Sequence, residues 1–223
     1  MSAVSLSILV GLLATLLALP PALFLGWVLE RTRWPGRGVV YVLVLLPLVL
    51  PPVVTGYLLL EFFSPRGMLG RQLESIGLPV AFHLAGAVVA ASVVGFPLLF
   101  MLVSYAYRSV DPALETVSRS LGRGGWETWW RVTLPLAWPG VAAGALLAFA
   151  RALGEFGATI VLAGHVPGET GTIPLAVMAL MDVPGAEGEV FALCGVSIFL
   201  GVLAVVGFRA LDKRHRTRLE LDR

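Results

Sequence analysis

The chain alternates between long hydrophobic runs that carry no charge and short segments rich in polar residues. The charge-free runs cover residues 3–29, 39–60, 79–107, 132–150 and 190–208. Each is close to the roughly 20 apolar residues that a helix needs to cross a bilayer. The fourth run continues into a mainly apolar stretch, so we place that helix at 134–162. The pattern therefore predicts an all-α membrane protein with about five transmembrane helices, at 3–29, 39–60, 79–107, 134–162 and 190–208.

Composition supports this class. Hydrophobic residues make up 57% of the chain and charged residues 13%, with a mean hydropathy of +0.88. Soluble domains carry about 25% charged residues, so we expect a multi-pass protein of the plasma (inner) membrane. The first run has no basic residues before it and exceeds the roughly 7 to 15 residues of a signal-peptide core, which favours a retained helix. Cys194 has no second cysteine, and His83, His165 and His215 lack metal-ligand spacing, so we expect no disulfide, metal or cofactor.

Basic residues are distributed unevenly among the loops. Arginine is concentrated in the first loop, the third loop and the C-terminal segment, which ends in a basic tail at 212–223. The second loop holds only Arg66 and Arg71, and the stretch 164–189 holds neither lysine nor arginine. Because basic residues favour the cytoplasmic side, the distribution predicts an external N-terminus and a cytoplasmic C-terminus. The formal net charge of +2 is thus an orientation signal, and we expect no nucleic-acid partner.

The polar segment 111–133 carries helix start and stop signals. Asp111 is suited to the N-cap, Pro112 to the first helical position, and Glu115 to the first turn, where the helix dipole favours an anion. Gly122 can end the helix by taking the left-handed conformation at low cost. A second short helical stretch is expected from residue 126 to 132. The sequence predicts a helix, a turn and a helix at the cytoplasmic face.

Two interpretations of this segment are open. Its tryptophans and arginines suit an anchor among lipid headgroups: Trp126, Trp129 and Trp130 with Arg123 and Arg131. The spacing of its glycine and proline, however, resembles that of the cytoplasmic EAA loop of ABC importer permeases. Gly122, nine residues, and then Val132-Thr133-Leu134-Pro135 match the Gly, nine residues, Ile-x-Leu-Pro of that family. The first half departs, because Thr116, Val117 and Ser118 replace the usual small alanines and Glu115 lies seven residues before Gly122 instead of six.

The resemblance implies a coupling helix that docks in a separate ATPase subunit and transmits its closure to the membrane helices. The coupling loop would then span 111–133. The positions expected to serve the ATPase contact are Glu115, Arg119, Leu121, Gly122, Arg123 and Pro135.

A second resemblance is narrower. "LPLVLPPVVTGYLLL" (46–60), "FARALGEFGATIVLAG" (149–164) and "VPGETGTIPLAVM" (166–178), in that order, resemble the permease subunits of molybdate importers. The likeness runs over 5–211 and implies an ABC type-1 permease domain that imports molybdate, with tungstate as a further substrate. Sulfate and other oxyanion permeases are similar, so they form the alternative. The family also implies two ATPase chains and an extracytoplasmic oxyanion-binding protein.

The residues themselves agree with a transport subunit that is not an enzyme. The single lysine, Lys213, is not part of a Gly-x-x-x-x-Gly-Lys-Ser/Thr motif, so we expect ATP hydrolysis on a separate chain. About five spans are few to enclose a pathway, which favours a homodimer in the lipid bilayer. Two other classes, a passive channel and a membrane scaffold, would need no coupling loop. A channel or secondary transporter would also show internal repeats, which the sequence lacks.

Candidate pathway residues occur at two places. Pro51 and Pro52 interrupt the second span, and Thr55 and Gly56 follow; interrupted backbone at depth is tolerated only against protein or a water-filled cavity. The alternative is a simple kink. Arg151 and Glu155 stand four apart on one helical face of the fourth span. They form either part of a gate or a self-satisfied ion pair.

The stretch 172–183 is too short to span a bilayer. Thr172 and Pro174 are suited to start a helix there. We expect a short external or re-entrant helix there, and the resemblance to the permease family implies that it helps to close the path and faces the binding protein.

Overall fold

The computed structural model describes residues 2–166 and 168–221, and the regular elements assigned within them are helical. Side chains are described up to Leu211, so the side chains of the predicted tail at 212–223 lie outside the described part. The helices are α1 (Ala3–Arg31), α2 (Arg37–Val49), α3 (Pro52–Phe63), α4 (Gly70–Ser75), α5 (Leu84–Arg108), α6 (Pro112–Ser120), α7 (Gly125–Thr128), the π-helical turn η1 (Trp129–Thr133), α8 (Leu134–Leu153), α9 (Gly157–Leu162), α10 (Ile173–Met181) and α11 (Glu187–Leu221).

Within the described residues, four helical stretches are long and apolar enough to cross a membrane: Ala3–Arg31, Leu84–Arg108, Gly125–Leu153 and Glu187–Leu211. Helices α2 and α3 together give a fifth if the bent pair counts as one span. Helices satisfy their own backbone groups, which is why long apolar runs adopt this form in lipid. The prediction of an all-α membrane protein with about five spans is confirmed.

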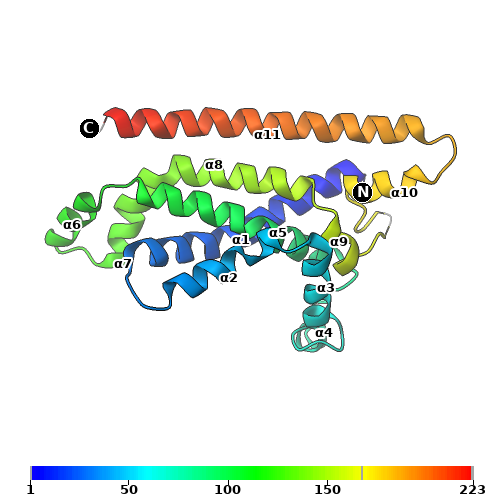
Figure 1. Ribbon diagram of the computed structural model, residues 1–223, viewed down its shortest axis with the longest axis horizontal. Coiled ribbons are helices and arrows are strands. Elements are labelled where there is room, and N and C mark those ends of the chain that lie inside the picture. The colour runs from blue at the N-terminus through cyan, green and yellow to red at the C-terminus, as the bar shows by residue number, and fades with distance from the viewer. Residues whose placement is uncertain (1, 167, 222–223) are drawn as a thin grey trace.

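Helix α5 is the centre of the bundle. It packs against α1, α2, α3, α8 and α9, and 67% of its most apolar window is buried, against 6% for α11. Small residues on α5, among them Ala87, Ala90 and Gly95, let neighbouring helices approach closely. Figure 1 shows α1, α5 and α8 running side by side, with α11 along the outer side of α8. Most of α11 is thus left for lipid or a second protein.

The range 39–60, predicted as one span, holds two helices that are bent by 114°. The bend lies at Pro51 and Pro52. A proline lacks an N–H group and keeps the preceding residue out of the α region. Leu50 and Pro51 accordingly have extended ψ angles of 140° and 134°. Pro47, by contrast, remains inside α2, and α3 points away from the bundle (Figure 1).

The range 134–162 is also divided. Helix α8 ends at Leu153, and a break over residues 154–156 precedes α9. Helix α9 packs against α3, so the two interrupted regions of the chain lie next to one another. Sequence periodicity alone predicts neither the position of the α8–α9 break nor the contact between α9 and α3.

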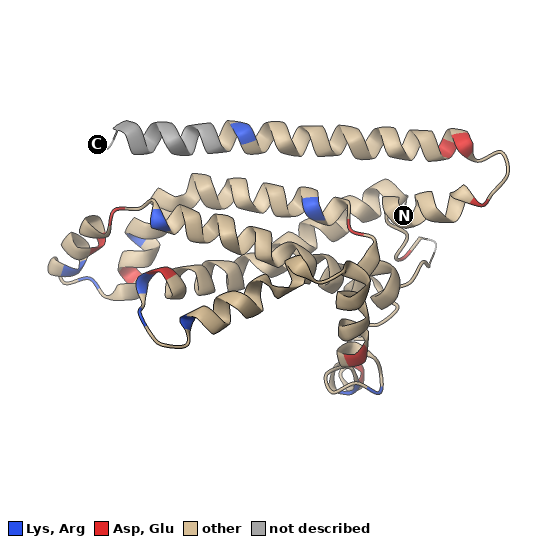
Figure 2. Cartoon of the chain, in the orientation of Figure 1, with Lys and Arg blue, Asp and Glu red and all other residues tan. Residues whose placement is uncertain are grey.

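Charged residues gather at two ends of the molecule, where one end carries basic and acidic residues together and the other carries acidic residues. Figure 2 shows arginines gathered at the end formed by α6, α7 and the start of α2, which we call the polar end. The opposite end carries acidic residues around the α10–α11 turn and at the start of α11. The short helix predicted after Thr172 is confirmed as α10, with Pro174 in its first turn. It packs against α11 and α1.

Candidate functional sites

The polar end holds the predicted helix, turn and helix. Asp111 caps α6, and its carboxylate accepts a hydrogen bond from the Ala113 N–H at 2.8 Å. Gly122 has φ +84°. The N–H of Gly122 donates to the Arg119 carbonyl and that of Arg123 to the Ser118 carbonyl, which is a Schellman ending. The predicted start and stop of this helix are confirmed.

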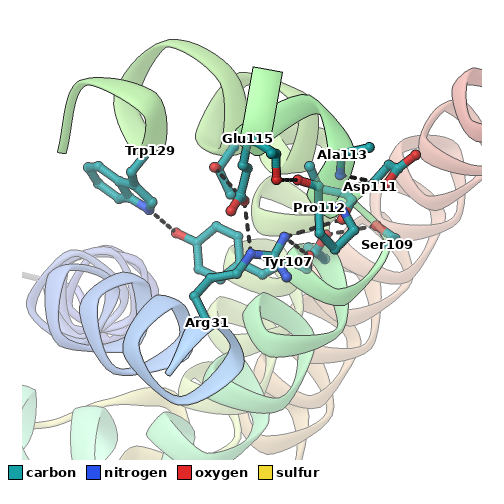
Figure 3. A network of polar contacts seen from close by, with 12 residues as sticks. Arg31, Tyr107, Ser109, Asp111, Pro112, Ala113, Glu115 and Trp129 are labelled. Atoms are coloured by element: carbon teal, nitrogen blue, oxygen red, sulfur yellow. Dashed lines mark hydrogen bonds and ion pairs between the residues drawn. The ribbon is translucent and has the colours of Figure 1, made fainter. Parts of the chain in front are cut away.

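Glu115 is buried beneath α6 and is held by two other helical segments. Arg31 Nε and Thr133 Oγ1 each donate to Glu115 Oε1 at 2.8 Å. The Nη2 of Arg31 donates to the carbonyls of Tyr107, at 2.8 Å, and Val110, at 3.2 Å. These contacts tie the end of α1 and the end of α5 to α6 and η1, and Figure 3 labels three of the residues involved, Arg31, Tyr107 and Glu115. We call Arg31, Glu115, Thr133 and the two carbonyls the joint.

A tryptophan cluster supports the joint from η1. The indole N–H of Trp129 donates to the Tyr107 hydroxyl at 3.1 Å, and the Trp129 ring stacks on Trp126 with centroids 4.6 Å apart. Ser118 and Thr128 share a buried hydrogen bond of 3.0 Å that fastens α6 to α7. Trp129, considered above as a lipid anchor, is instead a core residue, whereas Trp126 and Trp130 are exposed.

The π-helical turn of η1 precedes Pro135 for a physical reason. Leu134 N–H reaches back five residues to the Trp129 carbonyl. Pro135 has no N–H to continue the α-helical hydrogen bonds, so a wider turn at this point loses few backbone hydrogen bonds. The turn also directs the Thr133 hydroxyl to Glu115. A sequence pattern gives no signal for such a turn.

One face of α6 is apolar and uncovered. Its exposed residues continue onto α7 and η1, and we call this set the docking ridge: Leu114, Val117, Leu121, Trp126 and Trp130. Leu121 is 75% exposed. The side chain of Arg119 is 53% exposed, and Arg123 lies 3.9 Å from Glu127 in a surface pair. The predicted coupling residues therefore divide. Glu115 faces inward, and the others are exposed or partly exposed: Arg119, Leu121, Gly122, Arg123 and Pro135.

A second arginine–glutamate network reinforces the polar end. Arg108 donates through Nε and Nη2 to the two carboxylate oxygens of Glu30, at 2.8 and 3.0 Å. The hydroxyl of Tyr41 donates to the same carboxylate. Such two-pronged contacts are geometrically specific and strong. They hold the start of α2 against α1 and α5.

The contact between α3 and α9 brings the predicted pathway residues together. A Cβ added to Gly56 would lie 2.8 Å from the Cα and the carbonyl oxygen of Ala158, and one added to Gly157 would lie 2.8 Å from the Cβ of Pro52. Thr55 is buried on the same helix. Only glycine permits this approach of two backbones. Gly157 and Ala158 were not singled out as pathway residues, although glycine flanked by small residues is a signal of close helix packing.

Arg151 and Glu155 form the ion pair that their spacing predicts, with 2.9 Å between Nη1 and Oε2. The other carboxylate oxygen of Glu155 accepts the N–H of Ala158 at 2.9 Å. Glu155 therefore caps α9, the same turn that packs on α3. The structure thus places Pro52, Gly56 and the Arg151–Glu155 pair around one short helix.

One protein family and several known proteins are similar to this chain. Residues 22–217 match the family described as "Binding-protein-dependent transport system inner membrane component". The chain is 45% identical to the molybdenum transport system permease protein ModB of Escherichia coli (strain K12), over 97% of this chain and 95% of that protein. It is 41% identical to the ModB of Haemophilus influenzae, over 98% and 96%.

Two further similarities are more distant. A probable sulfate transport system permease protein, cysT, of Chlorokybus atmophyticus is 33% identical over 87% of this chain and 69% of its own length. A bacterial alginate ABC transporter, crystallised with an alginate-bound periplasmic protein, has a chain with TM-score 0.67 and 22% identity, covering 97% of this chain and 78% of that one. The last likeness concerns the fold alone.

Proposed function

Since the chain belongs to the family of binding-protein-dependent transport system inner membrane components, we propose that it is the permease subunit of an ATP-driven importer that moves molybdate into the cytoplasm. The assignment of molybdate as the substrate rests on the similarity to ModB proteins over nearly the whole chain. The sulfate permease relative is less similar and supports sulfate as the second candidate. Tungstate is close enough to molybdate in charge and shape to share the path.

The partner at the polar end is a P-loop ATPase. The docking ridge supports this, because an apolar face rimmed by arginines is suited to a groove in another protein. Arg119, Leu121 and Arg123 would contact the ATPase directly, and Gly122 sets the angle of the turn between them. Pro135 marks where the loop re-enters the membrane helix. With the ATPase on this side, the polar end is cytoplasmic and the N-terminus external, as the charge distribution predicts.

Glu115 has a different part in this proposal. It is enclosed by Arg31 and Thr133, so it does not offer its carboxylate to the ATPase. Instead it fastens α6 to α1 and α5, and a push on the docking ridge moves those helices together with α8. Coupling then passes through the joint as well as along η1 into α8.

The opposite end faces an extracytoplasmic oxyanion-binding protein. Helix α10 and the segment before it lie at that end, without lysine or arginine between residues 164 and 189. A second copy of the chain completes the pathway. This is supported by exposed apolar surfaces on α2, α3 and α11, and by a cavity of about 450 Å³ between α1, α2 and α5 that is lined almost wholly by apolar side chains. Lipid covers what the second copy leaves.

Uptake by the reconstituted transporter tests the proposal. The chain, its ATPase and the loaded binding protein are placed in proteoliposomes, and labelled molybdate uptake is followed with ATP inside. Unlabelled molybdate and tungstate should compete, and sulfate in the same range should not. Sulfate competing equally well would favour the second candidate. No ATP-dependent uptake of any of these anions, with the complex assembled, would overturn the proposal.

A further inference from the structure

Arg151 differs from the other described basic residues in its position. An apolar stretch, 132–150, precedes it and the apolar helix α9 follows the next short break. Arg151 lies in the last turn of α8, at the end of that helix remote from η1 and the polar end. A charged side chain inside a span is costly and is normally found facing protein or water. The position therefore needs a physical explanation.

The ion pair with Glu155 uses the two side chains unequally. Glu155 is almost wholly buried, and both of its oxygens are occupied, one by Arg151 and one by the Ala158 N–H. The side chain of Arg151 is 36% exposed, and its only ion pair among the described side chains is with Glu155, through Nη1 at 2.9 Å. A guanidinium has five N–H donors in a planar fork. Most of the donors of Arg151 are thus open.

The open side of Arg151 cannot face hydrocarbon without a large cost. Arg151 lies in the last turn of α8 and is followed by the further apolar helix α9. At a helix centre the insertion of an arginine costs about 2.5 to 3.5 kcal/mol even on the most lenient scale. The backbone is interrupted directly after Arg151, at the α8–α9 break, and α9 packs on α3, which begins at the α2–α3 bend. Interrupted backbone at this depth is tolerated only where it meets protein or a water-filled cavity. The exposed part of the Arg151 side chain at this interruption is therefore suited to water or a polar ligand.

We propose that Arg151 is an oxyanion contact on the translocation pathway, an inference that rests on the function proposed above. Its free N–H groups hydrogen-bond the tetrahedral dianion as it passes, in the way arginine recognises phosphate. Glu155 lowers the net charge at this point, so that the anion is held weakly enough to leave. Because Glu155 also caps α9, and α9 packs on α3, movement of α3 changes how far Arg151 is open to the path.

The alternative is that Arg151 only neutralises a buried carboxylate, and a double variant separates the two. Arg151→Gln combined with Glu155→Gln removes both charges, and the new amide oxygen can still cap Ala158. If Arg151 contacts the anion, molybdate uptake falls at least about tenfold, as expected for a lost charged hydrogen bond. ATP hydrolysis stimulated by the binding protein stays within about twofold, because docking and closure are untouched.

Controls make the result specific. Arg151→Lys keeps a cationic donor and should retain most uptake, and Arg71→Gln, at an exposed position in α4, should match the unaltered chain. Unaltered uptake by the double variant would overturn the proposal and leave Arg151 as a counter-ion. Loss of uptake by the unaltered chain itself would count against the proposed function instead, so the two failures are distinguishable.

A labelling experiment does not depend on transport. Arg151→Cys is combined with Glu155→Gln, and with Cys194→Ser to remove the native thiol. A water-soluble anionic thiosulfonate should modify the introduced cysteine, and molybdate should slow the modification. Reaction with a lipid-soluble maleimide but not with the thiosulfonate would show a lipid-facing position and overturn the proposal.

Discussion

Two buried glutamates, each paired with an arginine, lie at the joint and in the fourth span, and the two ion pairs differ in their surroundings. At the joint, Arg31 binds Glu115 at 2.8 Å and two backbone carbonyls, and its side chain is only 13% exposed. In the span, Arg151 binds Glu155 at a similar 2.9 Å but makes no further hydrogen bond or ion pair in the described part, and its side chain is 36% exposed. The distances are alike, and the difference lies in how completely each arginine is surrounded.

The partners also differ in their distance along the chain. Arg31 and Glu115 are 84 residues apart, so their contact fixes three helical segments relative to one another. Arg151 and Glu155 are four residues apart and flank a helix break, so they fix only the entry to α9. A closed, long-range pair stabilises architecture, whereas an open, local pair leaves hydrogen-bonding capacity for a ligand. Three predictions test this contrast.

The largest expected effect is on stability at the joint. Arg31→Ala leaves Glu115 buried with its main cationic partner missing and uncovers the carbonyls of Tyr107 and Val110. Breaking a buried pair in this way costs about 3–5 kcal/mol. Thermal unfolding of the purified chain in detergent should shift to clearly lower temperature, and less ATPase should copurify.

The matched control for this prediction is on the same carboxylate. Arg119 lies 3.9 Å from Glu115, but its side chain is 53% exposed. Exposed pairs contribute about 0–1 kcal/mol, so Arg119→Ala should leave the unfolding temperature nearly unchanged. Equal shifts for the two variants would contradict the view that enclosure, and not charge alone, makes the joint.

A smaller effect is expected where α3 meets α9. Gly56→Ala places a Cβ 2.8 Å from backbone atoms of Ala158, which cannot move aside as a side chain could. The wedge should cost about 1–3 kcal/mol and lower molybdate uptake, with ATPase docking preserved, because the in-span site shifts while every charge stays. Gly95→Ala, inside the bundle on α5, is the control, because the nearest atom to the added Cβ is the Ala148 carbonyl oxygen at an ordinary 3.8 Å, and it should leave uptake and stability unchanged. A Gly56→Ala transporter as active as this control would separate the α3–α9 contact from the pathway.

Local patterns in the sequence predict much of this molecule. Apolar run lengths predict the spans, and Asp111, Pro112 and Gly122 predict where α6 begins and ends. The four-residue spacing predicts the Arg151–Glu155 pair. Each of these depends on neighbours within one or two helical turns, which is the range over which a sequence pattern carries structural information.

Contacts between distant residues are what the pattern cannot supply. Arg31 contributes to the orientation signal like any other loop arginine, and nothing near it indicates that it binds Glu115. The prolines at 51 and 52 predict an interruption, but not a bend of 114° or its contact with α9. Glu115 has the sequence position of a docking residue and is nonetheless enclosed, because Thr133 approaches it from the π-helical turn.

The smallest expected effect is at the turn between α6 and α7. Gly122 has φ +84°, and an alanine there costs about 1 kcal/mol, although no atom lies within 4 Å of the added Cβ. If the turn sets the angle of the docking ridge, Gly122→Ala should weaken ATPase docking roughly fivefold, measured as ATPase retained on the immobilised chain across dilutions. Gly124→Ala is the control, because Gly124 has φ −69° and is equally unobstructed. A loss in both variants would point to the ridge surface, and a loss in neither would show that this end of the molecule tolerates a change of angle. A loss confined to Gly122→Ala would mean that the turn is held as rigidly as the joint beneath it and sets the angle of the docking ridge. The Arg151–Glu155 pair in the span, by contrast, is left open.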